Sequence, residues 1–149
     1  MGDAEFREGS LFEATPDFAE REIGNLTWIL DYNRQSLDGH RITNKEIMGG
    51  TDNERVENTM KANGWEVIQL RHGKLRKKLF GKKDGKDFQK FIEDELNDYA
   101  LQALLLIRDP KTLKTQMNKK YPKLKSFFKE VSDQELYEGL RDFGGHDVD

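Results

Sequence analysis

The chain has 149 residues, of which 36% are charged and 35% hydrophobic, and its formal net charge is −3. This length fits one domain that can bury a core, and the small net charge does not indicate a nucleic-acid partner. The absence of cysteine excludes disulfides, thiolate metal sites and a cysteine nucleophile. The sequence shows no signal peptide and no apolar run of membrane-spanning length, so we expect a cytoplasmic protein without a membrane partner.

The first third of the sequence predicts a helix followed by a strand. Residues 11–23 carry apolar side chains at roughly helical spacing, and Gly24 is expected to end this helix. A break near Thr15 is predicted because Thr15-Pro16 has the form of an N-cap and a first helical position. The continuous apolar run 26–30 is typical of a strand in a parallel sheet that is covered on both faces.

A second helix and strand are predicted to follow. Residues 51–54 have the form of a capping box, which begins a short helix, and Gly64 suits the C-terminal cap of that helix. Residues 65–70 form the second predicted strand. The strand–helix–strand order predicts a right-handed βαβ unit.

The second half of the sequence is predicted to be mainly helical. Apolar residues recur at three- and four-residue steps in 74–80 and 87–107, although 103–107 also fits a strand. Two further helices have recognisable start signals, an N-cap followed by proline and a capping box: Asp109-Pro110 and Ser132 to Glu135. The predicted fold class is therefore α/β, a parallel sheet with flanking helices and a helical second half.

Three oxygen-bearing side chains flank the first predicted helix and strand. Asp3 follows a glycine near the start of the chain, and Asn33 and Gln35 follow the strand at its carboxyl end. Open α/β sheets bind ligands at that end, and Mg²⁺ takes such oxygen ligands together with water and substrate phosphates. The alternative is that Asp3 is a disordered terminal residue and that the two amides form hydrogen bonds at a strand end.

These residues carry a resemblance to a known family. Gly2-Asp3 and the later Asn33 resemble the thiamine diphosphate motif of transketolase-like enzymes. Within that superfamily the chain is most similar to the E1 component of homodimeric pyruvate dehydrogenases, because several short segments recur in the same order. These segments are Asn25 to Gly39, Gly64 to Ile68, Tyr121-Pro122, Ser132 to Glu135 and Gly144 to Asp147. The resemblance covers nearly the whole chain but only a small part of such an enzyme.

The resemblance implies thiamine diphosphate and Mg²⁺ as cofactors. It assigns metal ligation to Asp3, Asn33 and Gln35. It assigns cofactor contact to Gly2, Ala4 and Glu5, and catalysis to His146. Ala4 stands where the family has a second glycine. A methyl group is tolerated there only if the backbone φ angle is negative.

The sequence predicts a setting for each of the three histidines and for the basic run 71–86. The resemblance implies that residues 144–147 lie in a mobile active-site loop, in which His146 assists acyl transfer to a lipoyl carrier, as imidazole can move a proton. The alternative is a flexible, solvated histidine. We expect His40 and His72 to be surface histidines, and the basic run 71–86 to be a solvated helix face.

The predicted function follows from the resemblance. We expect a fragment or split relative of a thiamine diphosphate-dependent 2-oxo acid (pyruvate) dehydrogenase E1, which decarboxylates the 2-oxo acid and transfers the acyl group to lipoyl. The alternatives are transketolase-type ketol transfer and a non-catalytic assembly module. The isolated chain is expected to be inactive, because in this family the glutamate that activates the cofactor lies in another domain.

The same resemblance sets expectations for organisation and partners. Residues 1–149 would be part of the diphosphate-binding domain, with the metal and diphosphate part in 1–72 and a helical part in 73–149. The expected partners are the remaining E1 segments or a second subunit, and the lipoyl-bearing acyltransferase (E2) of the parent complex. We expect 26–30 and the helix that carries Leu101, Leu104 and Leu105 to be left partly bare.

Overall fold

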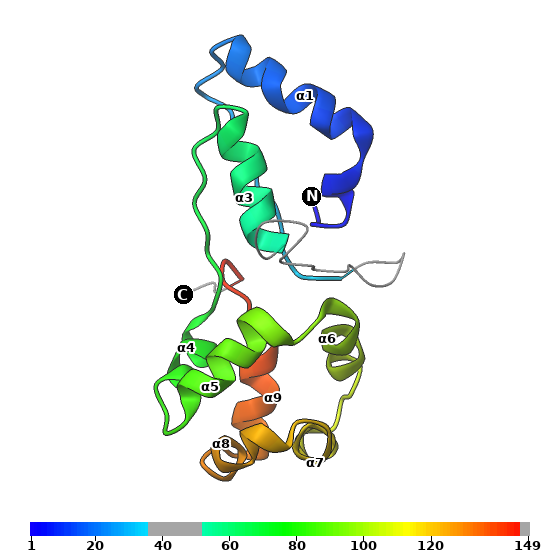
Figure 1. Cartoon of the computed structure of the whole chain (residues 1–149), viewed down its shortest axis with the longest axis vertical. Coiled ribbons are helices and arrows are strands. Elements are labelled where there is room, and N and C mark those ends of the chain that lie inside the picture. The colour runs from blue at the N-terminus through cyan, green and yellow to red at the C-terminus, as the bar shows by residue number, and fades with distance from the viewer. Residues whose placement is uncertain (36–51, 147–149) are drawn as a thin grey trace. The chain divides into compact units, whose positions relative to one another are not determined.

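The computed structural model describes residues 1–35 and 52–146, and the chain divides into two compact units, Met1–Gln69 and Leu70–Asp149 (Figure 1). Each unit is described by itself. In the described residues all regular structure is helical, and β-type pairing is limited to two isolated bridges, Gly2 with Asp31 and His72 with Phe143. The predicted α/β fold with a parallel sheet is therefore wrong.

The two expected strands are extended backbone without a ladder. Segments 26–30 and 65–70 have no regular secondary structure, and Ile29 and Ile68 are 76% and 80% exposed. A strand in a parallel sheet is stabilised by hydrogen bonds to its neighbours and by helices on both faces. The described residues offer neither segment such a neighbouring strand, so apolar composition alone did not produce a sheet and the predicted βαβ unit is wrong.

The first unit contains η1 (Glu5–Arg7), α1 (Gly9–Glu20) and α3 (Asp52–Ala62). Helix α1 continues through Pro16, so the break predicted near Thr15 is wrong. Proline removes one backbone donor from the helix, and the Thr15 hydroxyl donates to the carbonyl oxygen of Leu11 at 2.6 Å, one turn earlier.

Aromatic rings hold the first unit together. The indole Nε1 of Trp65 donates to the carbonyl oxygen of Thr15 at 2.9 Å, which ties the extended segment to α1. Four ring pairs have centroids 5.3–6.5 Å apart: Phe6–Phe12, Phe6–Trp28, Phe18–Trp65 and Trp28–Trp65. Among the described residues of this unit, Phe6 and Val56 are the fully buried apolar side chains.

Helices α1 and α3 end in the same way. At the end of α3, Trp65 N–H donates to the Met60 carbonyl and Gly64 N–H to that of Lys61, and Gly64 has a φ of +82°. This is a Schellman motif, in which the residue after the C-cap adopts the left-handed conformation. The predicted role of Gly64 is confirmed. At the end of α1 the same position is occupied by Glu22, with a φ of +54°.

The second unit is a bundle of short helices. Their bounds are α4 (Lys74–Phe80), α5 (Gly85–Lys90), η2 (Phe91–Glu95), α6 (Asp98–Leu105), α7 (Pro110–Lys120), η3 (Pro122–Leu124), α8 (Lys125–Lys129) and α9 (Asp133–Arg141). Helix α9 packs against α4 and α7 (Figure 1). The start signals at Asp109-Pro110 and at Ser132 to Glu135 are both confirmed by side-chain caps.

The helix predicted over 87–107 is interrupted. The chain makes a π-helical turn at η2 and becomes extended at Leu96, and the Asn97 side chain then caps α6 by accepting the Ala100 N–H at 2.8 Å. A capping side chain near the centre of an apolar periodic stretch ends one helix and begins the next. The alternative of a strand at 103–107 is wrong, because α6 extends to Leu105.

The core of the second unit is aromatic and aliphatic. Phe88 stacks on Phe127 with a centroid separation of 4.4 Å, and both rings are fully buried. Leu101 and Leu104 belong to this core at 2% and 4% exposure, so the expectation that they would be left partly bare is wrong, whereas Leu105 on the same helix is only partly buried. The matching expectation for 26–30 is confirmed by the exposure of its apolar side chains, such as Ile29.

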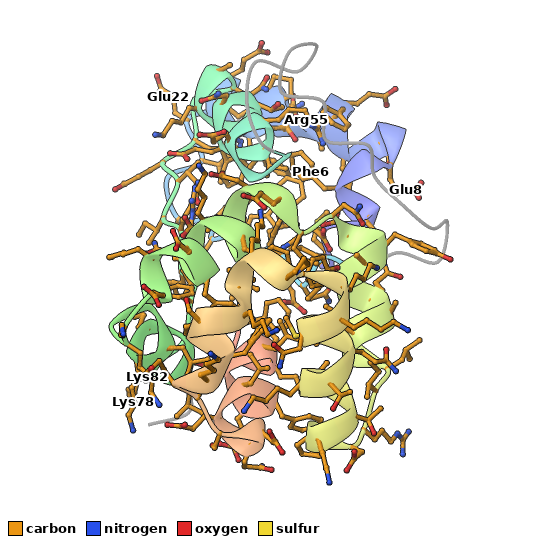
Figure 2. The ribbon with its side chains drawn as sticks, turned by 60° about the horizontal axis from the view of Figure 1, so that its bottom comes forward. Phe6, Glu8, Glu22, Arg55, Lys78 and Lys82 are labelled. Atoms are coloured by element: carbon orange, nitrogen blue, oxygen red, sulfur yellow. The ribbon has the colours of Figure 1, made fainter. Side chains whose placement is uncertain are left out.

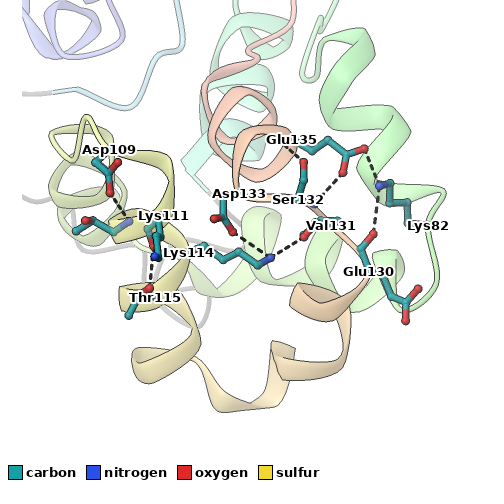
Figure 3. Close-up of polar contacts among 11 residues, drawn as sticks. Lys82, Asp109, Lys111, Lys114, Thr115, Glu130, Val131, Ser132, Asp133 and Glu135 are labelled. Carbon is teal, nitrogen blue, oxygen red and sulfur yellow. Dashed lines mark hydrogen bonds and ion pairs between the residues drawn. The ribbon is translucent and has the colours of Figure 1, made fainter.

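Two lysines clamp the connection between α8 and α9 (Figure 3). Lys82 Nζ donates to the Glu130 carbonyl at 3.2 Å and to Glu135 Oε1 at 2.7 Å. Lys114 Nζ donates to the Val131 carbonyl at 2.7 Å and pairs with Asp133 at 3.2 Å. Lys82, together with the Ser132 N–H, lowers the pKa of Glu135 to about 2.

No helix in the described ranges has the length and apolarity needed to cross a membrane. Charged side chains cover the exposed faces of both units, among them Glu8 and Glu22 at the two ends of α1 and Lys78 near the end of α4 (Figure 2).

Candidate functional site

The start of the chain runs beside the end of the first extended segment. The Met1 amino group donates to the Ile29 carbonyl at 3.1 Å, Asp31 N–H to the Met1 carbonyl at 2.8 Å, and Asp3 N–H to the Asp31 carbonyl at 3.0 Å. These bonds alternate between the two segments, and Gly2 pairs with Asp31 in parallel. The pairing places the Asp3 backbone against that of Asp31, two residues before Asn33.

Asp3 is the most deeply buried acid in the described part of the chain, at 1% exposure. Burying an ionised carboxylate costs free energy unless its charge is compensated. The alternative of a disordered terminal residue does not describe this side chain.

The turn after the extended segment has a defined hydrogen-bond geometry. Asn33 Nδ2 donates to Asp31 Oδ2 at 3.0 Å, and Asn33 Oδ1 accepts the Gln35 N–H at 2.8 Å. This is an Asx turn, and Arg34 within it has a φ of +61°. Gln35 Nε2 also reaches back to the Asn33 carbonyl at 3.4 Å. The turn therefore fixes the orientation of the Asn33 amide.

Asp31 is a residue that the sequence reasoning missed. It accepts from the Asn33 amide through its side chain and from Asp3 through its backbone. The signal was present, because Asp31 is the first acid after the apolar run 26–30, at the same carboxyl end from which the candidate ligands were chosen.

The residues assigned to cofactor contact have permissive backbone angles. Ala4 has a φ of −67° and a ψ of −43°, so its methyl group introduces no strain of the kind that would require glycine. Gly2 lies under the Glu5 side chain, whose Oε2 would be 2.6 Å from a Cβ at position 2. The Glu5 carboxylate thus lies close to the backbone between Gly2 and Ala4.

For a hard cation bound to a diphosphate, the ligands to consider are the ones predicted from the sequence. Within residues 1–35 and 52–146, no three His, Cys, Asp or Glu side chains gather as a metal site. A cation here would use one carboxylate, that of Asp3, and the amide oxygens of Asn33 and Gln35. Mg²⁺ accepts such a set with water or phosphate oxygens as further ligands. The assignment of these three residues remains a prediction.

The segment that carries His146 lies in the second unit. His146 is exposed, and its N–H donates to the Phe143 carbonyl at 3.4 Å. The two preceding positions require glycine for different reasons. Gly144 passes so close to the Leu70 carbonyl that a Cβ would collide with it, and Gly145 has a φ of +84°.

The expectation for His72 is wrong, and His40 lies outside the described residues. The His72 side chain is 13% exposed, and its Nε2 lies 2.9 Å from Glu93 Oε1. Its Nδ1 lies 3.4 Å from Nη1 of Arg76. Burial lowers the pKa of His72 and the Arg76 charge lowers it further, while the hydrogen bond to Glu93 opposes this shift.

Arg76 is the second residue that sequence reasoning missed. Its side chain is almost wholly buried, so the interpretation of 71–86 as a solvated face fails at this position, although it holds for exposed residues such as Lys77 and Lys78. The signal was again present. Arg76 precedes the buried Leu79 and Phe80 by three and four residues, which places it on the inner face of α4.

Comparison with known proteins links this chain to two kinds of enzyme component. It is 26% and 28% identical over 148 residues to proteins named pyruvate dehydrogenase E1 component from Buchnera aphidicola subsp. Baizongia pistaciae and Haemophilus influenzae, which covers 99% of this chain and 16% of each relative. It is 34% identical over 70 residues to an apulose-4-phosphate transketolase subunit of Phocaeicola vulgatus, which covers 47% of this chain and 23% of that relative.

The chain thus spans less than a quarter of the length of these curated relatives. No family model matches it, and no solved structure matches it. The similarity to E1 components and to a transketolase subunit is of low identity, and for the E1 components it extends over both units.

Proposed function

We propose that this chain is part of a thiamine diphosphate-dependent 2-oxo acid dehydrogenase E1, and that residues 1–35 contribute the half of its cofactor site that holds the metal and the diphosphate. The observation that carries this proposal is the parallel pairing of Met1–Asp3 with Ile29–Asp31, in which Asp3 bonds to Asp31, two residues before Asn33. The similarity to E1 components over 99% of the chain supports it.

Each residue in this half-site has a physical role. The Asp3 carboxylate offsets the cation charge, and the amide oxygens of Asn33 and Gln35 complete part of its shell. Gly2 and Ala4 present backbone without a bulky side chain where the diphosphate would approach. Asp31 positions the Asn33 amide through the 3.0 Å hydrogen bond to Nδ2.

The cofactor supplies the carbanion chemistry when it is bound, and the protein supplies binding, orientation and proton transfer. In this proposal the exposed imidazole of His146 moves a proton during transfer of the acyl group to a lipoyl carrier. The substrate of the whole enzyme would be a 2-oxo acid, with pyruvate as the candidate that the names of the relatives suggest.

The second candidate is transketolase-type ketol transfer. The transketolase relative has the higher identity to this chain, 34%, but the similarity is confined to 70 residues. The E1 similarity spans 148 residues and therefore includes the helical second unit almost entirely. This extent favours the dehydrogenase, and a transketolase assay on the assembled enzyme would separate the two.

The exposed extended segments support the part of the proposal that concerns partners. Ile29 and Ile68 are among the most exposed apolar side chains in the described ranges, and extended backbone with apolar side chains is suited to pairing with a strand of another chain. We expect this chain to function with the remaining E1 segments or a second subunit, and to lack turnover alone.

Titration calorimetry with thiamine diphosphate and Mg²⁺ tests the half-site. We expect weak binding, with a dissociation constant above about 1 μM, which corresponds to less than about 8 kcal/mol. The binding should require Mg²⁺ and should disappear in Asp3→Asn, which removes the charge but keeps the shape of the side chain. Binding that is independent of Mg²⁺ would contradict the assignment of Asp3.

Glu13→Gln provides the matched control. Glu13 is an exposed acid on α1 of the same unit, so this variant makes the same change in net charge. The control should bind as the parent does. Equal losses in the two variants would show that net charge, not the position of Asp3, governs binding, and the half-site would have to be abandoned.

A further inference from the structure

One buried arginine contacts the end of α9 and the segment that follows it. Arg76 Nε donates to the Gly139 carbonyl at 2.9 Å and Nη2 to the Leu140 carbonyl at 2.6 Å. These carbonyls lie in the last turn of α9, where few backbone donors remain, and that of Gly139 also accepts the Asp142 N–H at 3.4 Å. A guanidinium satisfies them and compensates the negative end of the helix.

The same side chain contacts the next residues of the chain. Its guanidinium carbon lies 4.7 Å from the centroid of the Phe143 ring, and the Arg76 backbone N–H donates to Asp142 Oδ2 at 2.8 Å. Such a stacked cation is attracted to the face of the ring. The Phe143 ring in turn lies 6.1 Å from the His146 ring.

Backbone pairing completes the attachment of this segment. Gly73 N–H donates to the Asp142 carbonyl at 3.2 Å, and Gly144 N–H donates to the Arg71 carbonyl at 3.3 Å. Residues 142–144 are therefore bonded to the residues just before and within the first turn of α4, and His146 N–H bonds back to the Phe143 carbonyl. Gly144 allows this close approach, because any side chain there would collide with the Leu70 backbone.

We propose that Arg76 is a positioning residue that holds the segment carrying His146, and that His72 makes this hold sensitive to protonation. The role in acyl transfer rests on the proposed function above. The contacts of Arg76 with the end of α9 and with the segment after it lie within the second unit and do not depend on any cofactor.

The tautomer of His72 explains why protonation of this ring should weaken the attachment made by Arg76. A guanidinium only donates hydrogen bonds, so Nδ1 of His72 accepts from Arg76 and the ring proton of the neutral form lies on Nε2, facing Glu93. Protonation places a second N–H at Nδ1, directed at the guanidinium. The hydrogen bond would be lost and two cations would face each other.

The charged groups around His72 come from η2, from α4 and from the segment before α4. Glu93 on η2 favours the protonated ring, while Arg76 on α4 and the adjacent Arg71 disfavour it, and the Phe80 ring packs edge-on against it. Burial and the arginines lower the pKa of His72 below 6.5 in the folded unit. Folding therefore resists protonation, and the hold weakens as the pH falls below about 6.5.

Amide hydrogen exchange of the full chain tests the hold. The informative amides are those of Gly73, Gly144 and His146, expressed as protection factors so that the intrinsic pH dependence of exchange is removed. In Arg76→Met we expect protection of these amides to fall at least about tenfold. Lys114→Met is the matched control, since Lys114 also caps a backbone carbonyl, that of Val131, and it should leave these amides unchanged.

His72→Gln tests the protonation step. A glutamine can accept from Arg76 and donate to Glu93 but carries no titrating group in this range. Between pH 7.5 and 5.5 we expect protection in the parent chain to fall relative to that of α7 amides, and protection in His72→Gln to stay level. The His72→Gln comparison also decides the matter if Arg76→Met fails to fold.

Two results would overturn the inference. Equal loss of protection at Gly144 in Arg76→Met and Lys114→Met would show that the unit as a whole is weakened. An unchanged pH profile in His72→Gln would show that His72 has no part in the hold. Because these measurements use no cofactor, a failure here is distinct from a failure to bind thiamine diphosphate.

Discussion

The two units of this chain differ in what stabilises them. Among the described residues, the second unit has 17 buried apolar side chains in one cluster, whereas the first unit has two, Phe6 and Val56. Their charges differ as well. Residues 1–69 contain 7 basic and 14 acidic residues, and residues 70–149 contain 18 and 14, which gives net charges of −7 and +4.

This difference separates the stable part of the chain from the part that carries the candidate cofactor residues. The second unit has an apolar core of its own, whose burial stabilises it. The first unit relies on aromatic contacts and a few backbone bonds, and it contains a buried carboxylate, that of Asp3. A unit of this kind gains stability from anything that binds its folded state, such as a cation, a diphosphate or a second chain.

A core substitution in each unit gives the largest expected contrast. Phe88 is fully buried and stacked on Phe127, so Phe88→Ala should destabilise the second unit by about 3–5 kcal/mol. Phe12 on α1 is 39% exposed, and Phe12→Ala should cost less than about 1.5 kcal/mol. Urea unfolding followed separately in each unit by amide NMR signals measures both. Similar losses would show that the first unit has a core as dense as that of the second.

Two glycines allow a contrast in backbone crowding. In the second unit, Gly144→Ala places a methyl group against the Leu70 carbonyl and should destabilise the unit by about 1–3 kcal/mol. In the first unit, Gly9 begins α1 with no atom near its absent Cβ, so Gly9→Ala should be neutral or stabilising by up to about 1 kcal/mol. Thermal unfolding of the two variants decides the sign in each case.

Acid should weaken the second unit through Glu135. Its pKa of about 2 in the folded unit lies below the ordinary value of 4.5, so the pair with Lys82 stabilises the unit fully above pH 4.5 and loses its effect as the pH falls toward 2. Because the carboxylate is 38% exposed, the effect should stay below about 1 kcal/mol.

Lys82→Met isolates this effect. The variant should raise the pKa of Glu135, although the Ser132 N–H still lowers it. The stability difference between pH 5 and pH 2.5 should therefore shrink in the variant. Carboxyl NMR titration of Glu135 checks the pKa directly, and an unchanged value in Lys82→Met would contradict the pairing.

The sequence predicted helix starts and ends correctly where these depend on hydrogen bonds between nearby residues. The caps at Asp109 and Ser132, the end of α3 at Gly64 and the bounds of α4 all follow from hydrogen bonds within a few residues. The sheet was wrong because a strand depends on neighbours that can be far along the chain or on another chain. The run 26–30 has the composition of a strand, but the described residues offer it only the short pairing with Met1–Asp3.

In the candidate site, too, local features could be predicted from the sequence and features that depend on distant packing could not. Asn33 and Gln35, chosen from the sequence, form one local turn, and Asp3 pairs with Asp31 just before that turn. The burial of His72 could not be found from composition, because a lone histidine is usually solvated, and that of Arg76 was indicated only by its helical spacing to Leu79 and Phe80. Their burial depends on the packing of α4 against α9 and on η2, which no single segment encodes.

The smallest expected effect concerns the end of α1, where Glu22 occupies the position that glycine occupies after α3. A non-glycine residue with a φ of +54° costs about 1–2 kcal/mol, of which glycine recovers all but the roughly 0.5–1 kcal/mol of extra entropy that it loses on folding. Glu22→Gly should therefore stabilise the first unit by about 0.5 kcal/mol, measured by amide exchange within α1. Glu22→Gln keeps the strained backbone while removing the charge near the negative end of the helix, so it separates the two causes. If the glutamine variant gains as much as the glycine variant, charge and not backbone strain limits the end of α1.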